Sequence, residues 1–177
     1  MGYLFQHKIV ELKLCQLLAE LPLYYLFRAT GRPRLLPLNL TLSVTFRCNS
    51  RCRTCNIYKK ASDELDLDEW RQVFHSLGRA PFWVTLSGGE PSLRYDLPEL
   101  VSSLYDICRP SMINIPTNGL LTDRIFEYVD EIARHCADAQ IIVNLSVDEL
   151  EDRHDRIRGV EGNFAKVMGT FRALKGL

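Results

Sequence analysis

The sequence lacks an apolar run long enough to cross a membrane, and it lacks an excess of charge of either sign. A membrane-spanning helix needs about 20 consecutive apolar residues, and the longest apolar runs here are far shorter. Lys plus Arg number 22 and Asp plus Glu number 22, so no whole-molecule field favours nucleic acid or an acidic polymer as a partner. Charged residues such as Lys8 and Glu11 also make the N-terminal stretch unlike a signal peptide. We therefore expect a cytoplasmic globular protein.

Cysteine is clustered rather than scattered. Three of the six cysteines, Cys48, Cys52 and Cys55, fall at the spacing Cys-x-x-x-Cys-x-x-Cys, directly after the strand-like run 40–45. Three thiolates on a short loop can each hold one iron of a 4Fe-4S cluster, which leaves the fourth iron without a protein ligand. Neighbouring arginines favour thiolates and offset the charge of a ligated cluster.

Other uses of these cysteines fit less well. A structural zinc site needs four ligands, and none of the four histidines lies near the loop. A disulfide does not suit three clustered thiols in a reducing compartment. An ordinary ferredoxin would supply a fourth cysteine in register, but Cys108 and Cys136 lie in apolar helical patterns and are expected in the core. The spacing therefore favours an iron-sulfur cluster with one open iron.

The first 38 residues differ in pattern from the rest. Apolar residues in 3–27 predict one or two helices, broken near Pro22, that pack under or across the following domain. The alternative is a helix on a membrane surface, with peripheral contact through residues 3–34, because aromatic and leucine residues precede Arg28, Arg32 and Arg34. We expect a helical extension and linker over 1–38 and a separate folded domain over 39–177.

From residue 39 onward, short apolar runs alternate with helical patterns, which indicates βαβ units and a parallel sheet. Strands are expected at 40–45, 82–86, 112–115 and 141–146. Helices are expected after Asp66, whose partner Glu69 suggests a capping box, and around Pro98, Thr122 and Asn163. The fold class is therefore α/β, with about four βα units.

Polar or glycine-rich groups follow each strand. The second strand runs into Ser87-Gly88-Gly89-Glu90-Pro91, the third ends Thr117-Asn118-Gly119, and the fourth ends at Ser146 and Asp148, with His154-Asp155-Arg156-Ile157-Arg158-Gly159 beyond. Loops after parallel strands gather on one face, where ligands bind. The alternative interpretations are a helix N-cap for Asp148, a solvated charge at a helix end for Arg158 and a surface or helix-face position for His154.

These motifs, in this order, resemble the radical S-adenosylmethionine (SAM) superfamily, in particular its peptide-maturation and cofactor-biosynthesis branches. The resemblance runs from about Leu40 to Phe164 and implies a partial (β/α) barrel. It implies that Cys48, Cys52 and Cys55 hold a 4Fe-4S cluster, and that Gly88, Gly89, Glu90, Ser146 and Arg158 bind SAM, Glu90 at the methionine amino group and the last two at the ribose and carboxylate. Thr54 and Glu149 depart from the family, which commonly has an aromatic residue and a glycine there.

The implied activity is reductive cleavage of SAM to methionine and a 5'-deoxyadenosyl radical, with an external electron donor such as flavodoxin or ferredoxin and an unidentified substrate. The alternative is a non-catalytic iron-sulfur or SAM-binding module, or an electron carrier. Because the family's barrel has six βα units and about four are expected here, we also expect a C-terminally incomplete domain whose turnover needs a further chain segment or a partner.

Overall fold

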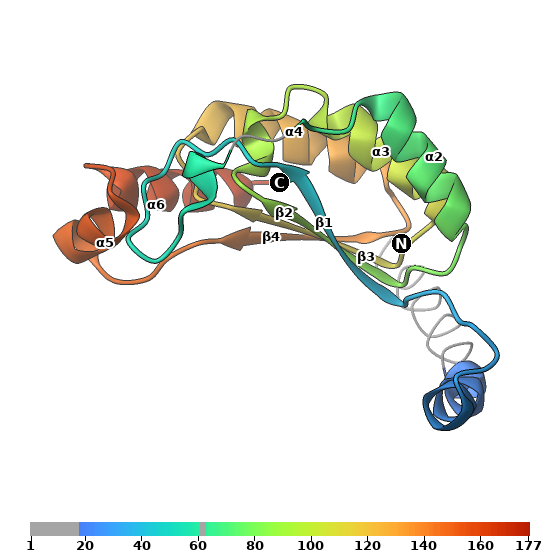
Figure 1. Ribbon diagram of the computed structural model, residues 1–177. Helices are drawn as coiled ribbons and strands as arrows, with labels where there is room; N and C mark the ends of the chain where they lie inside the picture. Colours follow the sequence, from blue (N-terminus) through green and yellow to red (C-terminus); the bar gives the residue numbers. More distant parts are fainter. Residues whose placement is uncertain (1–17, 61–62) are drawn as a thin grey trace.

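A four-stranded parallel sheet forms the centre of the protein (Figure 1). The computed structural model describes residues 18–60 and 63–177. The strands are β1 (Asn39–Thr45), β2 (Trp83–Gly88), β3 (Met112–Thr117) and β4 (Gln140–Leu145), in the order β1-β2-β3-β4. All three pairings are parallel, and the sheet does not close among the described strands. The predicted α/β class and the four predicted strands are confirmed.

Helices follow the strands, and those after the first three strands cover one face of the sheet, whereas the helix at Glu151–Arg158 lies beyond the strand ends (Figure 1). They are α2 (Leu67–Leu77), α3 (Leu97–Cys108), α4 (Thr122–His135), α5 (Glu151–Arg158) and α6 (Asn163–Leu174), with short 3-10 turns at Ile57–Lys59 and Pro91–Leu93. The capping box that begins α2 is confirmed: Asp66 Oδ1 accepts from the Glu69 N–H at 2.8 Å, and Glu69 Oε2 accepts from the Asp66 N–H at 2.9 Å.

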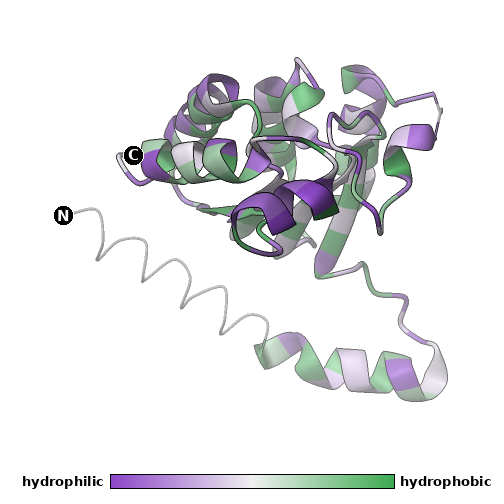
Figure 2. Cartoon of the chain, turned by 90° about the vertical axis from the view of Figure 1, so that its left-hand side faces the viewer, coloured by the Kyte–Doolittle hydropathy of each residue, from purple (hydrophilic) through white to green (hydrophobic). Residues whose placement is uncertain are grey.

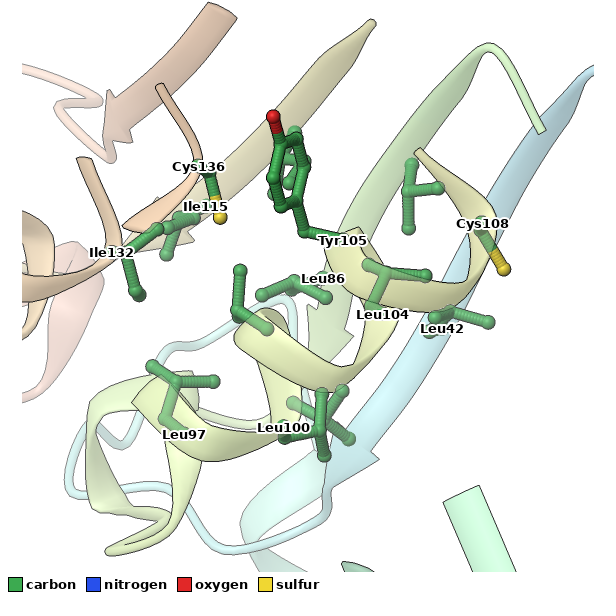
Figure 3. Packing of buried hydrophobic residues seen from close by; sticks show 14 of the residues in the cluster. Leu42, Leu86, Leu97, Leu100, Leu104, Tyr105, Cys108, Ile115, Ile132 and Cys136 are labelled. Carbon is green, nitrogen blue, oxygen red and sulfur yellow. The ribbon is translucent and has the colours of Figure 1, made fainter. Parts of the chain in front are cut away.

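The core lies between the sheet and the helices α2, α3 and α4. Alternate residues of each strand point toward the helices, and α3 packs its apolar side chains against them (Figure 3). The members buried to 2% exposure or less include Val44, Val84, Leu86, Leu97, Leu100, Val101, Leu104 and Ile113. Burial of each such side chain contributes roughly 1.5–3 kcal/mol. Cys108 and Cys136 are fully buried there, as predicted.

The N-terminal helix differs from the prediction. Residues 18–30 are helical without the break expected at Pro22. The ring of a proline fixes φ near the helical value, and the helix continues here although Pro22 has no N–H to donate. Most of this helix is exposed, and it lies near the end of the sheet where β1 begins (Figures 1 and 2). Its residues Glu20, Leu23 and Tyr24 line one cavity together with Pro81 and Phe82 of the domain. Packing of the N-terminal stretch under or across the domain stays a prediction, because residues 3–17 lie outside the described part of the chain. No described helix has the length and apolarity needed to cross a bilayer.

Candidate functional site

A cavity of about 210 Å³ opens at the carboxyl ends of the four strands. All eight residues that the sequence assigned to the site line it: Cys48, Cys52, Cys55, Gly88, Gly89, Glu90, Ser146 and Arg158. Thr117, Asn118 and Asp148 complete much of its polar wall. The topology thus brings together segments more than a hundred residues apart in the chain, because parallel strands end at one edge.

The three cysteines are free thiols on the loop that follows β1. Cys48 and Cys52 are half-buried, and Cys55 is exposed. Burial raises the pKa of the Cys48 thiol, and the negative charge of Glu90 adds to this rise against a backbone hydrogen bond from Ser50. No three described His, Cys, Asp or Glu side chains are arranged around a single metal ion. A cubane cluster has a different requirement, since each thiolate binds its own iron at a separate corner. The donor set fits such a cluster.

Gly88 and Gly89 fasten the second strand end to the cysteine loop. The Gly89 N–H donates to the Thr45 carbonyl at 2.7 Å, and the Glu90 N–H donates to the Arg47 carbonyl at 2.8 Å. A Cβ at Gly88 would overlap the Thr45 carbonyl oxygen, and one at Gly89 would overlap that of Arg47. Gly88 also has φ +107°, which L side chains rarely adopt. The two glycines therefore allow backbone to approach backbone.

The C-terminal end of α5 holds the other side of the loop. The Arg51 N–H donates to the Arg158 carbonyl and the Arg53 N–H donates to the Ile157 carbonyl, both at 2.9 Å. These carbonyls belong to the last turn of α5, where no intrahelical partner exists. Gly159 ends the helix with φ +65° and lies against Arg51, where a Cβ would come within 2.5 Å of the carbonyl oxygen. Arg158 and Gly159 thus help to hold the cysteine loop in place, Arg158 through its carbonyl and Gly159 through its lack of a side chain.

Asn118 connects the third strand end to the loop. Its side-chain Nδ2 donates to Asn49 Oδ1 at 2.7 Å and to Ser50 Oγ at 3.0 Å. Its backbone N–H donates to Glu90 Oε2 at 2.7 Å. Asn118 therefore ties the cysteine loop and Glu90 to β3.

Glu90 is 2% exposed and accepts four hydrogen bonds. Oε1 accepts from the Ser92 N–H at 3.2 Å, the Ser92 hydroxyl at 2.7 Å and the Thr117 hydroxyl at 2.7 Å, and Oε2 accepts from Asn118. All four donors are uncharged, so they orient the carboxylate without neutralising it. A buried anion that lines a cavity in this way suits a cationic ligand group.

Ser146, Asp148 and Arg158 form the wall on the β4 side. The Ser146 N–H donates to the Thr117 carbonyl at 2.9 Å. Arg158 Nε lies 2.7 Å from Asp148 Oδ2, and its Nη1 lies 3.8 Å from the sulfur of Cys52. Arg158 is 15% exposed, so it is no solvated charge, and the N-cap of α5 is Leu150 rather than Asp148. His154 lies on α5, as one of its two expected positions had it, but it is fully buried, so the other, a surface position, is wrong.

Glu64 is a residue of this region that the sequence did not reveal. Its Oε1 accepts from the Thr45 hydroxyl at 2.6 Å and the Phe46 N–H at 3.0 Å, and Arg47 Nη2 lies 3.6 Å from Oε2. Burial alone would raise the pKa of Glu64, but these hydrogen bonds and the charges of Arg47 and Arg94 hold it below its usual value. No sequence pattern marks Glu64, because its partners are set by the fold.

Comparison with known proteins agrees with this geometry. Residues 42–177 match the family model of the radical SAM superfamily. The chain is 31% identical over 146 residues to the sporulation killing factor maturation protein SkfB of Bacillus subtilis (strain 168), covering 78% of this chain and 33% of SkfB. It is 33% identical over 129 residues to Fe-coproporphyrin III synthase of Methanosarcina barkeri, covering 69% and 30%. The chain thus spans about a third of the length of these relatives.

The fold has a solved counterpart. SuiB of Streptococcus suis, in a structure bound to S-adenosylmethionine, superposes with a TM-score of 0.59 at 19% identity, over 79% of this chain and 32% of SuiB. At this identity the likeness concerns the fold, a partial barrel whose sheet is open here. With the cysteine spacing, the strand-end motifs and a family match over most of the sequence, the chain belongs to the radical SAM superfamily.

Proposed function

We propose that this protein is a radical SAM enzyme that binds a 4Fe-4S cluster through Cys48, Cys52 and Cys55 and binds SAM in the adjoining cavity. The observation that carries this proposal is that three thiols and one buried, un-neutralised carboxylate, Glu90, line the same cavity. In this family, a bound cluster supplies the electron that cleaves SAM reductively to methionine and a 5'-deoxyadenosyl radical.

The side chains of the cavity have separate roles in this proposal. Glu90 binds the amino group of SAM, since its carboxylate is already oriented by four donors. Arg158 and Ser146 bind the carboxylate and the ribose, and the guanidinium of Arg158 also balances the charge of a metal-bound thiolate at Cys52. Gly88 and Gly89 keep side chains out of the space between the loop and β2.

An external donor such as flavodoxin or ferredoxin would supply the electron, which agrees with a cytoplasmic location. SuiB has also been solved bound to its precursor peptide SuiA. A peptide is accordingly one substrate class to test for this chain.

Replacement of each cysteine tests the proposal. Anaerobically reconstituted Cys48→Ala, Cys52→Ala and Cys55→Ala should lose iron and sulfide, because a cubane held by two thiolates is poorly anchored. Cys108→Ala and Cys136→Ala are matched controls, since both lie in the core away from the cavity, and Cys15→Ala is a further control expected to keep the cluster. Unchanged iron and sulfide in Cys52→Ala would refute the assignment.

A second candidate is an electron carrier or a module that binds cluster and SAM without turnover. The exposure of Cys55 favours it, because one edge of a cluster would be open to another redox protein. Incubation of reconstituted protein with SAM and dithionite separates the two. Formation of 5'-deoxyadenosine supports the enzyme, and its absence from protein with a full cluster supports the carrier.

We also propose that the N-terminal helix contacts an anionic membrane surface. Tyr25, Leu26 and Phe27 are 70%, 48% and 38% exposed, and Arg28, Arg32 and Arg34 follow at the same end. The protein should sediment with vesicles of phosphatidylcholine containing phosphatidylglycerol. It should sediment less with phosphatidylcholine alone or when the three arginines are changed to glutamine. Equal sedimentation in all cases would refute the contact.

A further inference from the structure

A buried histidine on α5 is connected by hydrogen bonds to residues on two sides of the cavity. His154 is fully buried. Its Nδ1 lies 3.3 Å from the backbone nitrogen of Asp148, and its Nε2 lies 3.0 Å from Oδ1 of Asn163. A backbone N–H can only donate, so Nδ1 must accept and the ring proton lies on Nε2, which donates to Asn163. These contacts require a neutral imidazole in one tautomer.

The hydrogen bond to Asp148 connects His154 to Arg158, which lies beside the cysteine loop. His154 and Arg158 are four residues apart on α5 and therefore share a face of the helix. The Asp148 carboxylate holds Arg158 Nε at 2.7 Å, while Nη1 lies 3.8 Å from the Cys52 sulfur. By fixing the backbone of Asp148, His154 fixes the direction in which the guanidinium of Arg158 points.

The hydrogen bond to Asn163 connects His154 to Glu90. Asn163 is fully buried, and its Nδ2 donates to the Asn118 carbonyl at 3.2 Å. Asn118 in turn donates its N–H to Glu90 Oε2 at 2.7 Å. A continuous chain of hydrogen bonds thus runs from His154 to the carboxylate on the opposite wall of the cavity.

Asp155 fixes the turn that places Asn163. Its Oδ2 accepts from the Gly162 N–H at 2.6 Å, and its Oδ1 accepts from the Phe164 N–H at 2.8 Å. The ring of Phe164 packs edge-on against the His154 ring, with 5.9 Å between centroids. Packing and hydrogen bonds together leave His154 a single position.

We propose that His154 is a positioning residue that sets Arg158 relative to Glu90 and thereby sets the affinity for SAM. This inference rests on the proposed SAM site. His154 itself is fully buried and acts through Asp148 and Asn163. The Asp148 contact carries more of the effect, because Asn118 is also held by Asn49 and Ser50.

Two substitutions separate the contacts. His154→Asn keeps an acceptor near the place of Nδ1, and His154→Gln keeps a donor near the place of Nε2. For reconstituted protein, the dissociation constant for SAM should rise roughly tenfold in the Gln variant and less in the Asn variant, with iron content unchanged in both. An Asn variant that binds SAM as weakly as the Gln variant would overturn the proposal.

A double-mutant cycle shows whether His154 acts through Arg158. In an Arg158→Gln background, adding His154→Gln should weaken SAM binding far less than it does alone, because the residue that it positions is already gone. A full additional loss of roughly tenfold would mean that His154 acts independently.

The tautomer provides a readout that needs neither cluster nor SAM. In cluster-free wild-type protein, ¹⁵N NMR should show one histidine as the neutral Nε2–H form, identified by its disappearance in His154→Asn. An Nδ1–H form or an imidazolium at neutral pH would overturn the inference even if SAM binds. Failure of wild type to bind SAM, with the Nε2–H form present, would instead overturn the proposed function.

Discussion

Glu90 is the single residue on which SAM binding depends most in this account. Glu90→Gln should lower the affinity of reconstituted protein for SAM roughly ten- to a hundred-fold, because a charge-assisted hydrogen bond contributes about 1.5–3 kcal/mol. The NH₂ group of the glutamine would also point at a hydrogen-bond donor, either the Asn118 N–H or the donors of Ser92 and Thr117, because all partners of the Glu90 carboxylate are donors. Calorimetry measures the change, and Glu99→Gln, an exposed position on α3, is the control. Equal affinity in wild type and Glu90→Gln would show that the assignment is wrong.

The cysteines should also separate by reactivity. Burial raises the pKa of Cys108 to about 11 and, with a contribution from Asp106, that of Cys136 to about 12. Since the thiolate is the nucleophile, iodoacetamide at pH 8 should leave both unlabelled in folded, cluster-free Cys15→Ser protein while it labels the exposed Cys55. Peptide mass spectrometry detects the labels, and protein in urea should be labelled at every cysteine. Rapid labelling of Cys136 in folded protein would contradict the core described here.

At the scale of elements, the joint between the cysteine loop and β2 depends on glycine. Gly89→Ala should reduce cluster content and stability, because a Cβ there would overlap the Arg47 carbonyl oxygen. Gly169→Ala is the matched control: it lies inside α6 with no atom near its Cβ position, and alanine favours a helix by roughly 0.5–1 kcal/mol. Iron content and thermal unfolding compare the two variants. Equal behaviour would mean that the loop does not need this close approach.

The contribution of Glu64 to stability, at the point where β1 runs into the cysteine loop, should depend on pH. The pKa of this carboxyl is held below its ordinary 4.5, so folding favours the ionised form. Its contribution to stability is therefore present above pH 4.5 and is lost as the pH falls through the lower, folded value. Glu64→Gln should lower the free energy of unfolding by about 1–3 kcal/mol at pH 7, and the difference from wild type should shrink below pH 4.5. Urea unfolding at both pH values measures it, and a difference that grows in acid would contradict the sign.

Elements with a clear apolar period could be predicted from the sequence, and those without one could not. The four strands and the helices α2, α3, α4 and α6 follow their hydrophobic patterns. In α5, by contrast, six of eight residues are charged, so no apolar stripe marks it. The three cysteines were proposed from their spacing, and the other candidate site residues from the resemblance to the family. The burial of His154 and the contacts of Glu64 depend instead on neighbours that only the fold brings together.

At the scale of the whole molecule, the cavity is a property of the sheet rather than of any one motif. The cysteine loop is held by Gly89, by Asn118 and by the last turn of α5, which come from three different βα units. Loss of any of these supports should therefore weaken the cluster site without a change in its thiols. The surface that the N-terminal helix meets could not be predicted, because an apolar composition does not specify it.

The central claim, that one cavity holds both a cluster and SAM, is tested most directly by EPR spectroscopy. Anaerobically reconstituted wild-type protein, reduced with dithionite, should show the signal of a 4Fe-4S cluster. SAM should change that signal, because under the proposal it would bind beside the cluster that Cys48, Cys52 and Cys55 would hold. In Cys52→Ala the signal should be absent. A wild-type signal that is identical with and without SAM, or no 4Fe-4S signal at all, would contradict the account.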